Sequence, residues 1–310
     1  MQRRLGAAGF AVGSVAHLGT YCPATEAALR AFQHHRGLRV TGVCEEDTWK
    51  ALVEANWTLG DRLLVLTSPN LRGDDVGELQ ASLARLGFDC GRVDGIFGPR
   101  TAAALDDFQS NCGLTADAVC GVDTVRALRR VIGQTGQGPG ISAVREREWL
   151  RHAPATLGSL RVVVGQYGGL SSITRAVSRE LRHAGAHVVP LDEPDAVVQA
   201  RTANQFGAHL YVGFEASRAH ESIVHFYKVP TFESVGGKGL AGCLTAELRS
   251  CGLQLAEPCG MRLPVLRETR MPAVLVTLAP VRAAVDAAPQ VSTHVVRAVQ
   301  AWMTQCRHVG

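Results

Sequence analysis

Lysine is scarce in this sequence, and no cluster of basic residues occurs in it. Of the 32 lysine and arginine residues only Lys50, Lys228 and Lys238 are lysines, and the net charge is +4 over 310 residues. A nucleic-acid surface requires a basic block, commonly interleaved with aromatic residues, and no such block is present. We therefore expect no nucleic-acid partner.

Paired cysteine motifs are also missing. The nine cysteines include no C-x-x-C pair. In a chain of this length, an odd number of scattered cysteines predicts reduced, mostly buried thiols and a cytoplasmic protein. Cys243, Cys251 and Cys259 follow one another at intervals of eight residues, which is unlike the ligand spacing of structural zinc sites. We expect no zinc cluster from them.

Long hydrophobic runs are absent as well. No stretch of about 18 apolar residues occurs, so no membrane span is expected. The run LGAAGFAVGSVA after Arg4 has the composition of an export signal. It is rich in glycine, only weakly hydrophobic, and overlaps the repeat described next. We expect a cytoplasmic protein; export from a start site upstream of Met1 is the alternative.

The first half of the chain contains an internal repeat. The length predicts two or three domains, and 46% hydrophobic against 19% charged residues fits globular folding. Segments that begin at Thr25 and Thr101 match without a gap at an offset of 76 residues. The matched pairs are Leu29 with Leu105, Phe32 with Phe108, Gln33 with Gln109, Gly37 with Gly113, Cys44 with Cys120, Thr48 with Thr124, and Leu52 with Leu128.

Each copy predicts two helices joined by a turn. Thr25 and Thr101 are the expected helix caps, and Gly37 and Gly113 the expected left-handed residues that end the first helix. The second copy has a further helix upstream, with an apolar face at helical spacing. That face comprises Val76, Leu79, Leu83 and Leu86.

The second copy resembles the peptidoglycan-binding repeat of bacterial cell-wall hydrolases. The stretch VGELQASLARLGFDCGRVDGIFGPRTAAALDDFQSNCGL carries the LQ, LG, DG-x-FG-xxT, FQ and GL signatures in order. The first copy lacks the DG-x-FG loop, and its first helix is cut off before Arg3. The resemblance implies peptidoglycan or its precursors as ligand, and the candidate binding residues are Asp94, Gly95, Phe97 and Thr101. In the alternative interpretation, Asp94 and Gly95 form a tight turn and Phe97 belongs to the core.

The second half has a different architecture. A glycine-rich stretch, GQTGQGPG, predicts a flexible linker. The β-rich runs that follow are LRVVVGQ, HVVPL, LYVGF, SIVHFYK and AVLVTL, and they alternate with helical patterns at 171–184, 193–207, 237–252 and 289–305. The sequence therefore predicts a multidomain protein, with two small all-α repeats followed by an α/β domain with a mostly parallel sheet. The expected boundaries are 1–57, 70–132, a linker at 133–158, and 159–310.

Nearly all of residues 160–305 resemble the zinc-dependent N-acetylmuramoyl-L-alanine amidases. The motifs that carry the resemblance are VVVGQYGG, RELRHAGAHVV, ARTANQFGAHLYVGFEAS and VLRETRMPAVLVTL. The family implies a zinc ion held by two histidines and a glutamate, which lowers the pKa of a bound water. The hydroxide attacks the amide between the muramic acid lactyl group and L-alanine, and a second glutamate serves as general base.

This chain departs from the family at all four positions. Tyr167 stands where the resemblance places the first histidine, Glu215 replaces the second, and Thr277 replaces the general base. The segment LSSIT, after the first strand, offers no acidic ligand. The resemblance therefore implies no zinc and no catalytic residue.

Three other features bear on a site. A different metal site could form from Glu215, His220, Glu221 and His225, although a histidine in an apolar strand is more often a packed residue. Arg267 and Glu268 of the LRET motif are retained. They form either a structural ion pair or cap, or the lining of a remnant ligand pocket.

Two functions follow from these patterns. The first is a non-catalytic cell-wall regulatory protein that binds peptidoglycan, a precursor or a protein of precursor synthesis. It is similar to actinobacterial amidase homologues implicated in controlling that synthesis from the cytoplasm. The alternative is an active amidase, with zinc in an unconventional site. A plain peptidoglycan-binding adaptor, in which the α/β domain is only a scaffold, is a third interpretation.

Overall fold

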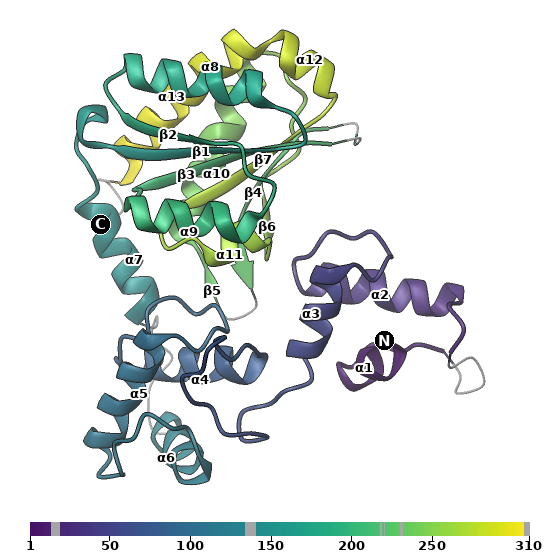
Figure 1. Ribbon diagram of the computed structural model, residues 1–310, viewed down its shortest axis with the longest axis vertical. Helices are drawn as coiled ribbons and strands as arrows, with labels where there is room; N and C mark the ends of the chain where they lie inside the picture. Colours follow the sequence, from purple (N-terminus) through teal and green to yellow (C-terminus); the bar gives the residue numbers. More distant parts are fainter. Residues whose placement is uncertain (14–18, 134–140, 218, 220, 230–231, 307–310) are drawn as a thin grey trace. The chain divides into compact units, whose positions relative to one another are not determined.

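The computed structural model describes residues 1–310 except 14–18, 134–140, 218, 220, 230–231 and 307–310 (Figure 1). The chain divides into two compact units. One comprises Met1–Arg145 with Pro230–Phe232, and the other comprises Glu146–Val229 with Glu233–Gly310. Within the described residues, no helix is both long enough and apolar enough to cross a membrane. The glycine-rich stretch predicted as a flexible linker lies, apart from Gly133, outside the described residues.

The first unit contains two copies of a three-helix repeat. The first copy consists of α1 (Gln2–Ala7), α2 (Pro23–His35) and α3 (Glu46–Glu54), around a core that includes Leu5, Leu29, Phe32 and Leu52. The second consists of α4 (Asp74–Arg85), α5 (Pro99–Asn111) and α6 (Val122–Ile132), around Leu79, Phe97, Phe108 and Leu128. Helix α1, which the sequence predicts to be cut short, has six residues, whereas its counterpart α4 has twelve.

The predicted helix caps are wrong, while the predicted helix ends are confirmed. Helices α2 and α5 begin at Pro23 and Pro99, where proline fixes φ and no donor is needed. Thr25 and Thr101 lie inside these helices and are buried. Gly37 and Gly113 follow α2 and α5 with φ of +62° and +67°, in the left-handed region that glycine adopts without strain.

The second unit is a three-layer α/β domain. Its helices are α7 (Ile141–Arg151), which belongs to this unit from Glu146 on, the short 3-10 helix η2 (Leu157–Ser159), α8 (Ser171–His183), α9 (Ala196–Phe206), α10 (Val235–Ser250), α11 (Pro264–Glu268), α12 (Val281–Asp286) and α13 (Ala288–Cys306). Its strands are β1 (Arg161–Tyr167), β2 (His187–Leu191), β3 (Leu210–Ala216), β4 (Ile223–Val229), β5 (Phe232–Glu233), β6 (Cys259–Met261) and β7 (Ala273–Leu278).

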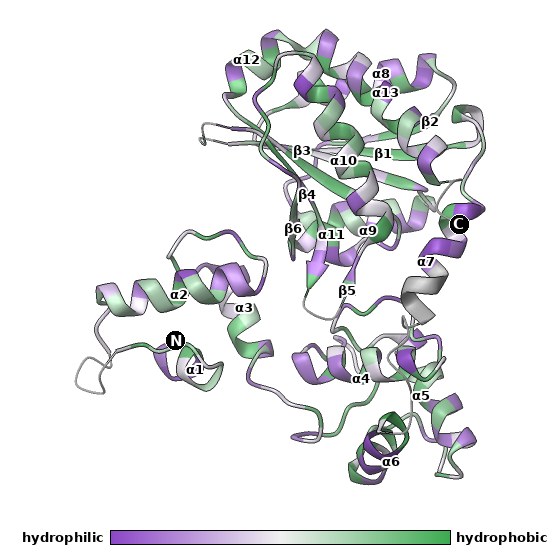
Figure 2. Cartoon of the chain, turned by 180° about the vertical axis from the view of Figure 1, so that it is seen from behind, coloured by the Kyte–Doolittle hydropathy of each residue, from purple (hydrophilic) through white to green (hydrophobic). Residues whose placement is uncertain are grey.

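The sheet is mostly parallel, as predicted. Its order is β2-β1-β3-β7-β4-β5, and β6 pairs with β4. The pairs β1–β2, β1–β3, β3–β7 and β4–β6 are parallel, whereas β4 runs antiparallel to β7. Apolar strand residues dominate the sheet in Figure 2, as expected for strands that are covered on both faces.

Two sets of helices cover the two faces of the sheet. Helices α8, α10 and α13 lie on one side, and α9 and α11 on the other (Figure 1). Alternate strand residues, among them Val164, Phe214 and Val276, enter the core shared with the first set. The residues between them, such as Tyr167, Tyr211 and Thr277, face the second set because side chains alternate along a strand.

The second unit begins earlier than the predicted boundary at residue 159. Helix α7 lies within the stretch expected as a linker, and its Leu150 is buried in the α/β core. The Glu146 carboxylate accepts hydrogen bonds from Ser234 Oγ at 2.6 Å and from the Val235 and Gly236 amides at 3.1 and 3.2 Å. A carboxylate at the N-terminus of α10 satisfies amides that have no partner within the helix. Residues 146–158 are therefore part of the folded unit.

Candidate functional site

Tyr167, Glu215 and Thr277 lie side by side at the carboxyl edge of the sheet. In the strand register Tyr167 pairs with Glu215, and Glu215 pairs with Thr277. With neighbouring strands about 4.8 Å apart, this row of three residues spans about 10 Å. The sheet thus brings together three positions that are far apart in the sequence. The carboxyl edge of parallel strands is where α/β proteins bind their ligands.

A short turn leads from this row into helix α8. Gly168 and Gly169 have φ of +80° and +81°, and α8 begins two residues later at Ser171. The buried side chain of Gln166 points to the face of the sheet opposite to Tyr167. It accepts a hydrogen bond from the Leu170 amide at 2.8 Å and donates one to Asp192, and these bonds fix the turn. Neither this turn nor the segment LSSIT that follows it carries an acidic side chain that could serve as a metal ligand.

Buried polar side chains fill the space beneath the row. The Tyr211 hydroxyl donates to Gln199 Oε1 at 2.8 Å, and Gln199 Nε2 donates to the carbonyls of Gln166 and Glu193 at 3.1 and 2.6 Å. A Cβ atom at Gly165 would overlap both Gln199 and Tyr211, so only glycine leaves room for them. The Tyr167 and Tyr211 hydroxyls are 3.5 Å apart.

Burial raises the pKa of Tyr211 well above its usual value. The phenol is therefore neutral at physiological pH, and it acts as a hydrogen-bond donor to Gln199. Sequence reasoning missed Tyr211 and Gln199. The feature of the sequence that could have revealed both residues is a glycine in each of two strands. These glycines, Gly165 and Gly213, lie opposite each other on β1 and β3 and leave room for the two side chains.

The residues present do not fit the zinc ion that is typical of the amidase family. Zinc prefers thiolate, imidazole and carboxylate ligands, and the row offers one carboxylate, one phenol and one aliphatic hydroxyl. Thr277 Oγ1 is shielded from solvent and has no hydrogen-bond partner among the described residues. Across the described part of the chain, no group of three or more His, Cys, Asp and Glu side chains could hold a metal ion.

The alternative metal ligands are not brought together either, as far as the structure describes them. His225 is buried on β4 opposite Leu275, whereas Thr277 pairs with Ile223. His225 therefore lies two residues inward from the row. His220 lies outside the described residues.

Arg267 and Glu268 lie at the end of α11, which packs on α9. Arg267 is buried, and Glu268 is half-buried. Asn204 of the RTAN motif donates to the Glu268 carbonyl and accepts from the Arg270 amide, both at 2.9 Å. The conformation of this segment is thus fixed by Asn204, a residue that sequence reasoning did not select.

Three of the four candidate binding residues of the second repeat, Asp94, Gly95 and Thr101, are hydrogen-bonded to Gln80. Its Nε2 atom donates to Asp94 Oδ1, the Ile96 carbonyl and Thr101 Oγ1 at 3.0, 3.0 and 3.1 Å. Its Oε1 atom accepts from the amides of Asp94 and Gly95 at 3.0 and 2.8 Å. Phe97 and Thr101 are buried. These contacts support the alternative of a tight turn and core, since buried side chains offer no surface to a ligand.

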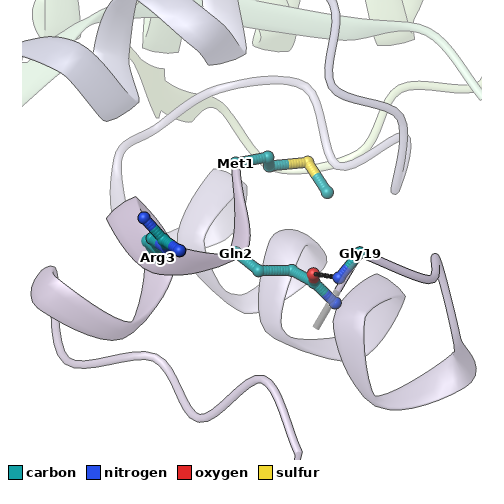
Figure 3. A pocket seen from close by; sticks show the side chains of 4 residues that line it. All are labelled: Met1, Gln2, Arg3 and Gly19. Carbon is teal, nitrogen blue, oxygen red and sulfur yellow. Dashed lines mark hydrogen bonds between the residues drawn. The ribbon is translucent and has the colours of Figure 1, made fainter. Parts of the chain in front are cut away.

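A pocket of about 370 Å³ lies in the first repeat (Figure 3). Met1, Gln2, Arg3 and Gly19 line it, and Gln2 Oε1 accepts from the Gly19 amide at 2.7 Å. None of the residues selected from the sequence lines this pocket. It belongs to the first unit, and the row belongs to the second.

Two segments of the chain match the domain family described as "Putative peptidoglycan binding domain". The matched residues are 1–52 and 72–128. Both three-helix copies are therefore repeats of this kind, including the copy that departs from the loop signature. The chain thus combines two repeats of this domain family with an amidase-like α/β unit.

The relatives of the chain agree with this class. It is 34% identical over 284 residues to the N-acetylmuramoyl-L-alanine amidase CwlM of Mycobacterium tuberculosis, a match that covers 81% of this chain and 70% of that protein. The chain belongs to the N-acetylmuramoyl-L-alanine amidase family. It is also 32% identical over 152 residues to the amidase CwlL of Bacillus licheniformis, which covers 43% of this chain and 42% of that protein.

Among solved structures, the chain is similar to the catalytic domain of the N-acetylmuramoyl-L-alanine amidase CwlV from Bacillus (Paenibacillus) polymyxa var. colistinus. Its similarity to this chain has a TM-score of 0.39 and 17% identity, covering 47% of this chain and 99% of that domain.

Proposed function

We propose that the chain is a non-catalytic member of the amidase family, which binds peptidoglycan or one of its precursors and acts in cell-wall regulation. The observation that carries the proposal is the register of Tyr167, Glu215 and Thr277. According to the resemblance drawn from the sequence, these positions would hold two zinc-binding histidines and the general base. The row instead supplies one carboxylate between two hydroxyl groups.

The chemistry of hydrolysis supports this interpretation. Loss of a general base alone costs about 10²–10⁴-fold in rate. A catalytic zinc ion lowers the pKa of its bound water to about 7, and without it no hydroxide is available at neutral pH. The Tyr211 and Gln199 side chains, which are hydrogen-bonded to each other beneath the row, are not ligands that zinc prefers either.

Ligand and location complete the proposal. The two peptidoglycan-binding repeats favour peptidoglycan or its precursors as the ligand, and a protein of precursor synthesis as a possible partner. None of the nine cysteines, all of which lie in the described residues, forms a disulfide, which is compatible with the cytoplasm as the expected location.

The test combines the zinc content of the purified full chain with an assay of stem-peptide release from muropeptides. We expect far less than one zinc per chain and no release of stem peptide, in the wild type and in Glu215→Ala alike. Binding of intact muropeptides, recovered uncut by mass spectrometry, would be the positive result.

The alternative function is an active amidase with an unconventional metal site, and Glu215 is the observation in its favour, because it is a possible zinc ligand at the edge of the sheet. About one zinc per chain, lost in Glu215→Ala together with stem-peptide release, would establish this alternative and overturn the proposal.

A further inference from the structure

Helices α8 and α13 carry arginines on the outer surface of the α/β unit. The two helices pack against each other on the same side of the sheet (Figure 1). From Ile173 to the end of α8, the exposed residues are Arg175, Arg179, Arg182 and His183. Helix α13 exposes Arg297. We define the basic face as these four arginines, which lie on the side of the sheet away from the row of candidate site residues.

Helical geometry gathers these residues, although the sequence contains no basic block. Arg175, Arg179 and Arg182 follow one another at intervals of four and three residues, so they lie on one face of α8. A rise of about 1.5 Å per residue spreads the three residues over about 10 Å. Packed helices lie about 8–10 Å apart, and with Arg297 the basic face is two helices wide.

Acidic residues on the two helices do not neutralise the basic face. Helices α8 and α13 carry four arginines but only one acidic residue, Glu180. Glu180 Oε1 lies 3.7 Å from Arg179 Nε at the surface, where an ion pair contributes little. Arg175 and Arg297 have no ion-pair or hydrogen-bond partner in the part of the chain that the structure describes.

The charges on the neighbouring elements are paired or lie at the border of the basic face. Arg282 and Asp286, both exposed, balance each other on α12. Asp192 lies where α8 begins, and it accepts a hydrogen bond from Ser171. The ion pairs around α10 are Lys238 with Glu233, Arg249 with Glu257, and Glu247 with His294 of α13. The excess of positive charge therefore belongs to α8 and α13.

Only part of this charge has a structural role. Arg182 and His183 lie in the last turn of α8, where cations interact favourably with the helix dipole. Arg182 Nη2 also donates to the Val188 carbonyl at 2.8 Å. Arg175 and Arg179 lie in the middle of α8, where neither the dipole nor a cap accounts for them.

We propose that the basic face binds the anionic phospholipid headgroups of a bilayer surface. Clusters of about four to eight basic residues on a helical surface are typical of proteins that bind such headgroups, and guanidinium groups bind phosphate with two parallel hydrogen bonds. The ligand is chosen by what the face lacks. None of the large hydrophobic residues that are exposed in the described part of the chain lies on α8 or α13.

This lack of apolar side chains argues against two other partners. A protein interface is anchored by aromatic and other apolar residues at its centre. Single-stranded nucleic acid is bound largely by stacking of its bases on aromatic rings. A layer of headgroups requires only positive charge spread over a surface, and the basic face provides this.

Co-sedimentation of the full-length protein with lipid vesicles tests the proposal. Vesicles of phosphatidylcholine with about one third phosphatidylglycerol should bind the protein at about 0.1 M salt, whereas vesicles of phosphatidylcholine alone should not. At about 1 M salt the Debye length falls to about 3 Å, so the protein should be released. Equal binding to both kinds of vesicle, or binding that persists at high salt, would overturn the proposal.

Removal of two arginines assigns the binding to the basic face. Arg175→Gln combined with Arg179→Gln should weaken binding at least about tenfold, because each cation near an anionic bilayer contributes about fivefold. The matched control removes the same charge from exposed positions on α6 and α9, by Arg130→Gln combined with Arg201→Gln. It should weaken binding less than about threefold. Equal losses in the two double variants would show that net charge alone decides, and would overturn the assignment.

Two further measurements separate the bilayer from other anionic partners. Arg175→Lys combined with Arg179→Lys should retain binding, because the headgroup layer responds to charge; loss of binding in this variant would contradict that. Binding of polyglutamate or of duplex DNA tighter than that of vesicles, and lost in the double glutamine variant, would identify another occupant and overturn the choice of a bilayer. Circular dichroism melts would confirm that each variant is folded.

Discussion

Gln80 Nε2 donates a hydrogen bond to the buried hydroxyl of Thr101 at 3.1 Å, and the same relationship recurs three times in the chain. Gln2 donates to Thr25 at 2.8 Å, Gln33 to Thr48 at 3.1 Å, and Gln109 to Thr124 at 3.2 Å. In each case the glutamine also binds the backbone of the intervening loop. A glutamine therefore holds a loop and the next helix together in all four cases, and in three of them it belongs to an LQ or FQ signature.

The first prediction concerns this arrangement. Gln80→Leu should lower the free energy of unfolding of the second repeat by at least about 2 kcal/mol, because the amides of Asp94 and Gly95 lose their acceptor in a buried site. Amide hydrogen exchange of α4 and α5 would measure the loss. The matched control is Arg126→Leu, at an exposed position on α6, which should change stability by less than about 0.5 kcal/mol. Equal effects would contradict the role given to Gln80.

The order of secondary structure could be predicted well from the sequence, for a physical reason. Strands such as AVLVTL and helices such as α8 carry their own periodicity, and alternation of the two dictates a parallel sheet. The positions Tyr167, Glu215 and Thr277 came from the family resemblance, and their register agrees with it because parallel strands end at one edge. A short element such as β6 carries no period, and so it was missed.

The contacts inside the site could not be predicted. Gln199 reaches Tyr211 only because Gly165 and Gly213 lie opposite each other in space, which local sequence does not reveal. Phe97 and Thr101 were candidate ligand residues on the strength of a signature, yet the signature records a buried turn. Glu146 was assigned to a linker, because its partner Ser234 is far away in the sequence.

The second prediction is a pH dependence caused by Tyr211. Its folded-state pKa is raised by burial, while an unfolded tyrosine titrates near 10. The native state therefore retains the proton longer, so the stabilisation is fully present below about pH 10 and is lost as the pH rises further. Above that pH, the wild type should lose up to about 1.4 kcal/mol per pH unit more than Tyr211→Phe.

Urea unfolding of both proteins between pH 9 and 11 provides this measurement. Other groups, including the cysteines, titrate in both proteins, so the difference between the two curves isolates Tyr211. Parallel pH profiles would show that Tyr211 ionises as readily in the native state as in the unfolded state.

The third prediction concerns the attachment of α7. Glu146→Ala should destabilise the α/β unit by about 1–3 kcal/mol, because the carboxylate bonds to two amides and a hydroxyl at the start of α10. Glu148→Ala is the control on the same helix, where the side chain pairs with Arg151 at the surface. Urea denaturation should separate the two variants, and a loss of similar size in both would refute the capping role.

The fourth prediction is a hierarchy of thiol reactivity. A hydrogen bond with Thr25 lowers the pKa of Cys22, whereas burial raises the pKa of Cys120 and of Cys306 to about 12. The thiolate is the reactive species, so iodoacetamide at pH 7.5 should modify Cys22 first and leave the other two intact in the native protein. Peptide mapping at increasing times would measure the order. Thr25→Val should slow alkylation of Cys22 because it removes the hydrogen bond that favours the thiolate, and modification of Cys120 at the rate of Cys22 would contradict the buried position of Cys120.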